Sequence, residues 1–212
     1  MKSVVRVFRK TVLLDRKSQD LTMKKNIKDN IIAIAQNTFR KYGFRKTTMD
    51  EIAFAAGKTK STMYYYFESK EEVFKAVVEK EVVQLRSEIL EAVNEKSGAK
   101  QKLEAYIFTR MKGFRKLGNF YELLKDEFLS NLEFAEKIRT VYDRNETDTL
   151  AQIIQEGIDN KEFKNLNAML TARTIVIAMK GLEAPALIEN DMDAFMKEIG
   201  DMMNILFYGI CN

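Results

Sequence analysis

The stretch that decides the fold is Thr47–Phe74, TTMDEIAFAAGKTKSTMYYYFESKEEVF. Thr48 and Glu51 are spaced as a capping box, in which the hydroxyl and the carboxylate satisfy free amides at a helix start. Gly57 then predicts a tight turn, and Thr59 or Ser61 can cap the next helix. Two short helices joined by such a turn predict a helix-turn-helix.

The second short helix is expected to carry a polar, aromatic face. Met63 and Phe67 lie four residues apart and are predicted to face inward. A tyrosine ring can lie against sugars or thymine methyl groups, its hydroxyl can donate to a phosphate oxygen, and lysine supplies positive charge. We therefore expect DNA contacts from the opposite side of the helix, which carries Lys60, Ser61, Thr62, Tyr65 and Tyr66.

Positive charge is concentrated in the N-terminal third. Residues 1–70 hold 16 Lys and Arg against 6 Asp and Glu, a net charge of +10. Residues 71–212 hold 19 against 25, a net charge of −6, and the whole chain is +4. This asymmetry favours a polyanionic partner, of which nucleic acid is the commonest.

Composition excludes most enzyme classes. The chain has no histidine and a single cysteine, Cys211, so zinc-finger spacings and Ser-His or Cys-His nucleophiles are absent, and we expect no cofactor and no metal. The carboxylates Glu122, Asp126 and Glu127 could in principle serve an all-α enzyme, but their spacing is ordinary for an exposed helix and no Glu-x-x-His motif accompanies them. No apolar run approaches the ~20 residues of a membrane span, and the N-terminus lacks a signal-peptide hydrophobic region. We expect a cytoplasmic protein without catalytic activity.

The chain is predicted to be all-α, with about nine helices. It contains one proline, Pro185, and nine glycines at positions typical of helix ends. Residues 1–22 are expected to form a basic N-terminal arm, disordered in part, or an extension upstream of the true start. A DNA-binding domain is expected over 23–69 and a helical domain over 70–212. Apolar periodicity predicts helices over about 27–42, 48–56, 60–67, 70–93, 99–117, 120–130, 132–160, 166–183 and 191–209.

These motifs together resemble the DNA-binding domain of the TetR (tetracycline repressor-like) transcriptional regulators. The likeness covers roughly fifty residues and is weaker, mainly in helix count, over the rest of the chain. It implies a three-helix DNA-binding head followed by a helical body. The matching residues are Ala35, Phe39 and Gly43 in the first helix, Ile52, Ala53, Ala56 and Gly57 at the turn, Tyr64, Tyr65, Tyr66 and Phe67 in the recognition helix, and Ser69, Lys70 and Glu71 after it.

The resemblance implies roles for individual residues. Thr47 or Thr48, Tyr64, Tyr66 and Lys70 are expected at DNA phosphates. Lys60, Ser61, Thr62 and Tyr65 are expected at base edges or neighbouring phosphates, and Thr59 is counted with them. Lys58 stands where the family usually has an aliphatic residue, so its stem can pack while its ammonium reaches solvent or phosphate. Ser61 stands where the family frequently has a glycine.

The last two helices are apolar on more than one face, which a helix with a single core-facing stripe does not require. One interpretation is burial within a single chain. The resemblance implies instead a homodimer through a four-helix bundle, which would place two recognition helices about 34–36 Å apart on a palindromic operator of double-stranded DNA. The residues expected at this interface are Ile175, Met179, Phe195, Ile199, Met202, Met203, Leu206, Phe207 and Ile210.

A third group of apolar residues is either ordinary core or the lining of an effector cavity. The resemblance implies a small, largely apolar effector that releases DNA, and Arg110, Lys112 or Arg173 could meet an acidic group on it. The leading hypothesis is a ligand-responsive repressor, and the alternative is a constitutive dimeric DNA-binding protein with no effector site. The cavity residues are Phe108, Met111, Phe114, Phe120, Tyr121, Leu124, Phe128 and Tyr142.

Overall fold

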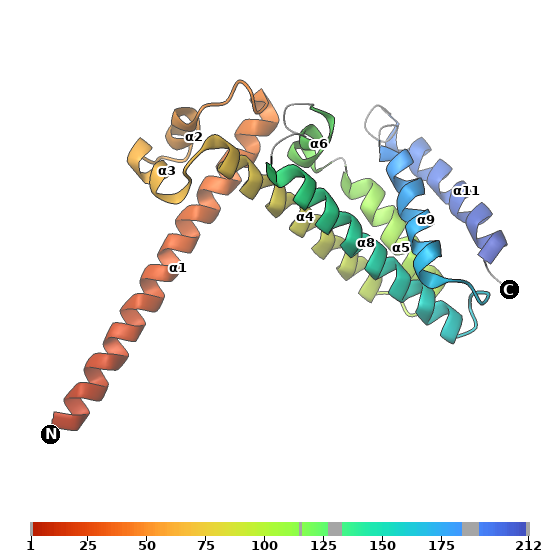
Figure 1. Ribbon diagram of the computed structural model, residues 1–212, viewed down its shortest axis with the longest axis horizontal. Helices are drawn as coiled ribbons and strands as arrows, with labels where there is room; N and C mark the ends of the chain where they lie inside the picture. The colour runs from red at the N-terminus through yellow and green to blue at the C-terminus, as the bar shows by residue number, and fades with distance from the viewer. Residues whose placement is uncertain (1, 115, 127–132, 184–190, 211–212) are drawn as a thin grey trace. The chain divides into compact units, whose positions relative to one another are not determined.

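The computed structural model describes residues 2–114, 116–126, 133–183 and 191–210, with the backbone alone for residues 2–21 (Figure 1). Within these ranges the chain forms nine α-helices and no β-strand. The prediction of an all-α fold is confirmed. The chain divides into two compact units, residues 1–77 and 78–212.

The first unit holds α1 (Lys2–Tyr42), α2 (Met49–Ala55), α3 (Lys60–Tyr66) and the first turns of α4 (Lys70–Asn94). Gly43 ends α1 with φ +78°, a left-handed conformation that glycine adopts without strain, and its amide donates to the Phe39 carbonyl at 2.7 Å. Residues 2–42 contain no glycine or proline, so nothing interrupts the helix. Residues 2–22, where we expected an arm disordered in part, therefore continue α1 as helical backbone.

Three phenylalanines pack together in the core of the first unit. Phe74 lies edge-on to Phe39, with ring centroids 5.2 Å apart, and 4.9 Å from Phe44. Phe74 and Val77 are fully buried, which ties the first two turns of α4 to this core. The boundary between the units accordingly falls after Val77, within α4, whereas the sequence placed the domain join around residues 68–70.

The second unit contains the rest of α4 and the helices α5 (Ala99–Phe114), α6 (Gly118–Lys125), α8 (Glu133–Asp159), α9 (Ala168–Gly181) and α11 (Met192–Ile210). Helix α8 packs against α5 and α9, and α11 contacts α5. A Cβ atom at Gly113 would lie 2.2 Å from Leu85 Cδ1, so the glycine allows α4 and α5 to approach closely.

Two glutamates from distant parts of the chain cap helices in this unit. Glu81 of α4 is 1% exposed, and its carboxylate accepts from the Asn119 and Phe120 amides at 3.1 and 3.0 Å, at the start of α6. Glu162 accepts in the same way from the Ala99 and Lys100 amides of α5. Each carboxylate satisfies helix amides that have no intrahelical partner.

The described part of the chain contains no candidate membrane span and no candidate metal site. None of its helices is long and apolar enough to cross a membrane. No group of three or more His, Cys, Asp or Glu residues in it is placed to hold a metal ion.

Candidate functional site

Helix α2 begins at the predicted capping box. The Thr48 side chain accepts from the Glu51 amide at 3.3 Å, and the Glu51 carboxylate accepts from the Thr48 amide at 2.8 Å. The turn after α2 ends at Gly57, which has φ +62°. These local contacts fix the direction in which α3 leaves the turn.

Helix α3 is anchored by its cap and by its inner face. The Thr59 side chain accepts from the Thr62 amide at 3.2 Å. Met63 and Phe67, at the end of the helix, are 0% and 1% exposed, so the prediction that both face inward is confirmed. With this face buried, the remaining side chains of α3 lie on the outer side.

The outer side of α3 carries the aromatic and hydroxyl groups expected there. Tyr64 and Tyr65 are 47% and 65% exposed, and Ser61 is exposed. Tyr66 is half-buried, and its ring stands edge-on to that of Tyr65, with centroids 4.9 Å apart. Lys60, Ser61, Tyr64 and Tyr65 are thus brought together on one exposed helix face, while Thr62 and Tyr66 are half-buried.

Lys60 on this face forms an ion pair with Asp50. Its ammonium donates to Asp50 of α2 at 3.0 Å, and both side chains are largely exposed. The hydrogen bond to Asp50, and then the charge of Asp50, raise the pKa of Lys60, so it stays fully charged at neutral pH. In the absence of DNA, Asp50 therefore offsets part of the positive charge of α3.

Two predicted phosphate contacts differ from expectation. Thr47 is 1% exposed and its hydroxyl donates to the Gly43 carbonyl at 2.8 Å, so Thr47 is removed from the candidate contacts and Thr48, which is exposed, remains. The Lys70 ammonium donates to the Phe44 carbonyl at 2.9 Å and lies 4.2 Å from the centre of the Phe44 ring. Two of the three ammonium donors of Lys70 remain for a phosphate. Lys58 is half-buried, as its predicted packed stem requires.

Sequence reasoning missed two neighbours of this face. The Lys24 ammonium of α1 lies 5.8 Å from the centre of the Tyr65 ring, which places a further cation beside α3. Phe54 of α2 is 88% exposed, although it stands in an apolar stretch of the sequence. The only sequence signal for Lys24 was the excess of positive charge before residue 70.

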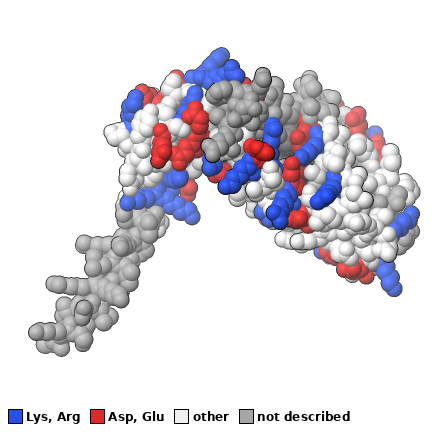
Figure 2. All heavy atoms as spheres, viewed as in Figure 1, with Lys and Arg blue, Asp and Glu red and all other residues white. Residues whose placement is uncertain are grey.

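On the face drawn in Figure 2, the positive and negative side chains of this unit are mixed. In Figure 2 the blue Lys and Arg side chains of the first unit are interspersed with red Asp and Glu side chains on the face in view. Six of the 16 Lys and Arg residues counted before residue 71 fall in residues 1–21, whose side chains lie outside the description.

The residues predicted to line an effector cavity are only partly brought together. Phe120 and Tyr142 lie with ring centroids 5.3 Å apart and share the wall of a cavity of about 270 Å³. Met111 is fully buried and Phe108 half-buried, and neither lines that cavity. Phe128 and the side chains of Phe114, Tyr121 and Leu124 lie outside the described residues.

Arg110 takes a role that the sequence did not predict. It is fully buried, donates to Glu146 through Nε at 2.9 Å and through Nη2 at 3.3 Å, and donates to Glu183 at 2.5 Å. Burial alone would lower the pKa of Arg110, but Glu146 and neighbouring groups outweigh burial and raise it. Burial raises the pKa of Glu183, and Arg110 offsets part of that rise. Arg110 is therefore engaged inside the protein and not available as the predicted contact for an acidic effector, whereas Lys112 and Arg173 are exposed.

The predicted interface residues of α9 and α11 are mostly core of their own unit. Their exposed fractions are at most 5%, except for Met202 at 45% and the half-buried Leu206, and Ile210 is not described as a side chain. Besides Met202, the exposed apolar side chains of these helices lie at positions that were not predicted, namely Met169, Leu170, Ile177, Ile205 and Tyr208. Met202 and Ile205 line an apolar groove of about 270 Å³ between α5, α9 and α11.

Comparison with known proteins supports the helix-turn-helix. The family model described as bacterial regulatory proteins, tetR family, matches residues 31–77. The fatty acid metabolism regulator protein of Bacillus subtilis (strain 168) is 26% identical over 186 residues, which cover 86% of this chain and 94% of that protein.

Solved structures agree over nearly the whole length. A transcriptional regulator from Cytophaga hutchinsonii ATCC 33406 is 30% identical with a TM-score of 0.72, covering 86% of this chain and 97% of that one. The regulator FadR from Bacillus subtilis, solved in complex with stearoyl-CoA, is 23% identical with a TM-score of 0.66, covering 82% and 96%, and it supports the fold alone.

Proposed function

This chain belongs to the tetR family of bacterial regulatory proteins, which are DNA-binding transcription regulators, and on that premise we propose that it is a homodimeric repressor. In this proposal the dimer binds a palindromic operator through α3 and leaves it when a small effector binds in the second unit. The observation that carries the DNA-binding part is the exposed face of α3, with Lys60, Tyr64 and Tyr65 outward over a buried Met63.

The contacts follow from the chemistry of that face. Lys60 and the α3 tyrosines are proposed at phosphates and base edges, with Thr48 and Lys70 at phosphates on either side. Asp50 must give up Lys60 to a phosphate, which is feasible because an exposed ion pair is worth only about 0–1 kcal/mol. Lys24 is added to the contacts that the sequence suggested.

The dimer is proposed to form through the exposed side chains of α9 and α11. Ile177 and Ile205 are 70% and 73% exposed, and Tyr208 is 88% exposed. Met202 and Ile205 share the wall of the apolar groove between α9 and α11, and exposed apolar side chains grouped in this way are typical of a protein interface. A second copy related by a two-fold axis would cover the same patch on both chains.

The effector is proposed to be a largely apolar small molecule. The relative named for fatty acid metabolism and the FadR structure with stearoyl-CoA make molecules with a hydrocarbon chain the first class to test. The second candidate, a constitutive DNA-binding dimer, is favoured by one observation: the cavity between α4, α5 and α8 holds only about 30 Å³.

Selection of bound sequences from random double-stranded DNA tests the proposal. We expect a palindromic consensus, and sedimentation of the complex should give two chains per duplex. Ile205→Lys should give monomers and weaken operator binding, whereas Lys197→Glu, an exposed change on the same helix, should not. Recovery of sequences without two-fold symmetry, or of none above the random pool, would contradict it.

A further inference from the structure

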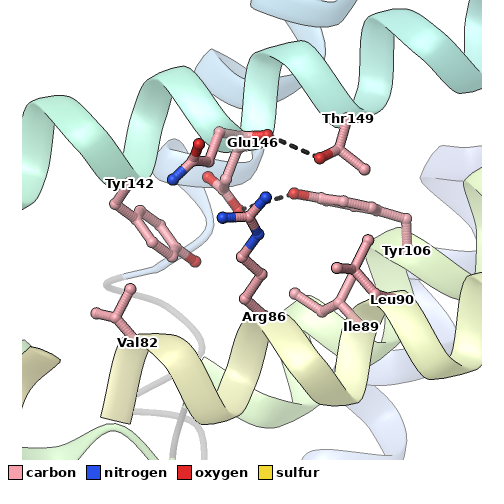
Figure 3. A pocket seen from close by; sticks show the side chains of 9 residues that line it. Val82, Arg86, Ile89, Leu90, Tyr106, Tyr142, Glu146 and Thr149 are labelled. Carbon is pink, nitrogen blue, oxygen red and sulfur yellow. Dashed lines mark hydrogen bonds between the residues drawn. The ribbon is translucent and has the colours of Figure 1, made fainter. Parts of the chain in front are cut away.

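A small cavity in the second unit presents hydrogen-bond donors on one side and hydrocarbon on the other. It lies between α4, α5 and α8, and Figure 3 shows Tyr142 reaching from α8 toward α4, Tyr106 pointing in from the opposite side and Arg86 rising from α4 between them. The cavity is lined by Val82, Arg86, Ile89, Leu90, Tyr106, Tyr142, Asn145, Glu146 and Thr149.

Tyr142 is a buried donor without a partner. The residue is 6% exposed, and its hydroxyl meets no acceptor at hydrogen-bonding distance and angle among the described residues, although the Glu146 carboxylate lies near enough to raise its pKa. Burial raises the pKa of Tyr142, so the phenol keeps its proton at neutral pH and can donate. A buried hydroxyl is normally hydrogen-bonded, so the group indicates a partner that is not part of the chain.

Arg86 is a second donor at the same cavity. Its side chain is exposed, and it forms no ion pair or hydrogen bond with the described residues. The one carboxylate in the wall, Glu146, is already bound to Arg110 through two contacts. Arg86 therefore donates only to solvent and Tyr142 has no acceptor, and an anionic group with acceptor oxygens would bind both.

The rest of the wall sets the other half of the ligand. Val82, Ile89 and Leu90 of α4 give the cavity a hydrocarbon side. At about 30 Å³ the cavity holds one water molecule, so a larger ligand needs more space. Tyr142 also lines the neighbouring cavity of about 270 Å³, which gives its ring room to shift.

We propose that this cavity binds an amphipathic carboxylate, with the carboxylate between Arg86 and the Tyr142 hydroxyl and the hydrocarbon along α4. This inference rests on the proposed function and names the chemical class of its effector. A single bridging water is the competing occupant, and it would satisfy Tyr142 without any need for Arg86.

The test uses three probes that share an eight-carbon body: octanoate, methyl octanoate and octylamine. Binding to the full-length protein is measured by calorimetry, and operator affinity is measured in parallel. We expect octanoate to bind most tightly and to weaken operator binding. Arg86→Gln should reduce octanoate affinity about tenfold while leaving methyl octanoate unchanged, because the lost contact is with the charge. Tyr142→Phe should weaken both by several fold.

Two controls separate ligand contact from damage to the fold. Arg144→Gln and Tyr42→Phe remove the same groups from exposed positions and should not alter octanoate binding. Tyr142→Phe should also leave the melting temperature of the ligand-free protein unchanged or higher, because it removes a hydroxyl that has no partner. A lower melting temperature would show that the hydroxyl is already satisfied, and would overturn the proposal.

The remaining outcomes are equally decisive. If the operator is bound but octanoate is not, or if octylamine binds most tightly, this inference fails while the proposed DNA-binding function stands. If the operator itself is not bound, the proposed function fails. Octanoate binding that is unchanged in Arg86→Gln would place the carboxylate elsewhere and overturn the assignment.

Discussion

Replacing Arg110 by leucine should destabilise the second unit more than any change of its partners. Leucine leaves the Glu146 carboxylate, 3% exposed, without a cation, and such an uncompensated buried charge costs about 3–5 kcal/mol. Glu183 is 18% exposed and makes one contact with Arg110, so Glu183→Gln should cost only about 1 kcal/mol. The expected order of destabilisation is Arg110→Leu, then Glu146→Gln, then Glu183→Gln.

Two further results follow from the same charges. Arg110→Leu combined with Glu146→Leu removes both buried charges, so the double variant should recover most of the stability lost in Arg110→Leu. In Arg110→Leu itself, the partly buried carboxyl of Glu183 loses the cation that offsets part of the burial. The pKa of Glu183 then lies further above its unfolded value, so the free energy of unfolding of this variant should decrease as pH rises.

Urea unfolding followed by far-UV circular dichroism measures these free energies, since the chain is helical and has no tryptophan. Protein concentration must be fixed, because a dimer gains stability by mass action. Arg144→Gln, at an exposed pair on α8, is the control and should change stability by less than about 0.5 kcal/mol. The reasoning is refuted if Arg110→Leu costs less than about 1 kcal/mol, or if the double variant is no more stable than Arg110→Leu.

The helix-turn-helix offers three smaller predictions. Thr48→Ala removes the α2 cap and should lower the free energy of unfolding by about 1 kcal/mol in a urea titration, and an unchanged midpoint would contradict the capping role. Gly57→Ala places a side chain at φ +62° and should lower the free energy of unfolding by about 1–2 kcal/mol in the same titration. Ala55→Gly is the nearby control and tests only the loss of helix propensity. Equal stability of Gly57→Ala and the wild type would argue against the turn as described. Asp50→Asn frees Lys60 and should tighten operator binding in a fluorescence-anisotropy titration. The loss of operator affinity caused by Lys60→Ala should be larger in the Asp50→Asn background than in the wild type. Additive effects of the two substitutions on affinity would show that the pair is not coupled in solution.

The DNA-binding head could be predicted because its signals are local. The capping box at Thr48, the turn at Gly57 and the four-residue spacing of Met63 and Phe67 each involve neighbours in sequence. Thr47 was the exception: two adjacent threonines are equivalent in the sequence, and only the fold turns the first inward to Gly43.

The second unit was harder to predict from the sequence because its polar contacts join residues that are far apart in the chain. Glu81 lies on a helix where the sequence shows an ordinary charged position, and its partners start another helix 38 and 39 residues further on. Arg110 likewise meets Glu146 and Glu183 at separations of 36 and 73 residues. No local pattern distinguishes such a buried charge from an exposed one.

The proposed interface helix α11 shows a third limit of prediction from the sequence. The sequence revealed apolar residues on more than one face of this helix but not which of them face the core. The structure buries Phe195, Ile199, Met203 and Phe207, at a spacing of four, and exposes Met202 and Ile205. The choice depends on how α11 packs against α5, which periodicity alone does not specify.

The salt dependence of operator binding tests the central claim most directly, because each phosphate contact from a cation contributes a slope of about −0.9 in log affinity against log salt. For the wild type we predict a steep negative slope, and for Lys60→Ala a slope shallower by about one contact. Lys164→Ala, at an exposed position in the second unit, is the matched control and should keep the wild-type slope. A Lys60→Ala slope equal to that of Lys164→Ala would contradict the assignment of α3 as the DNA-contacting surface.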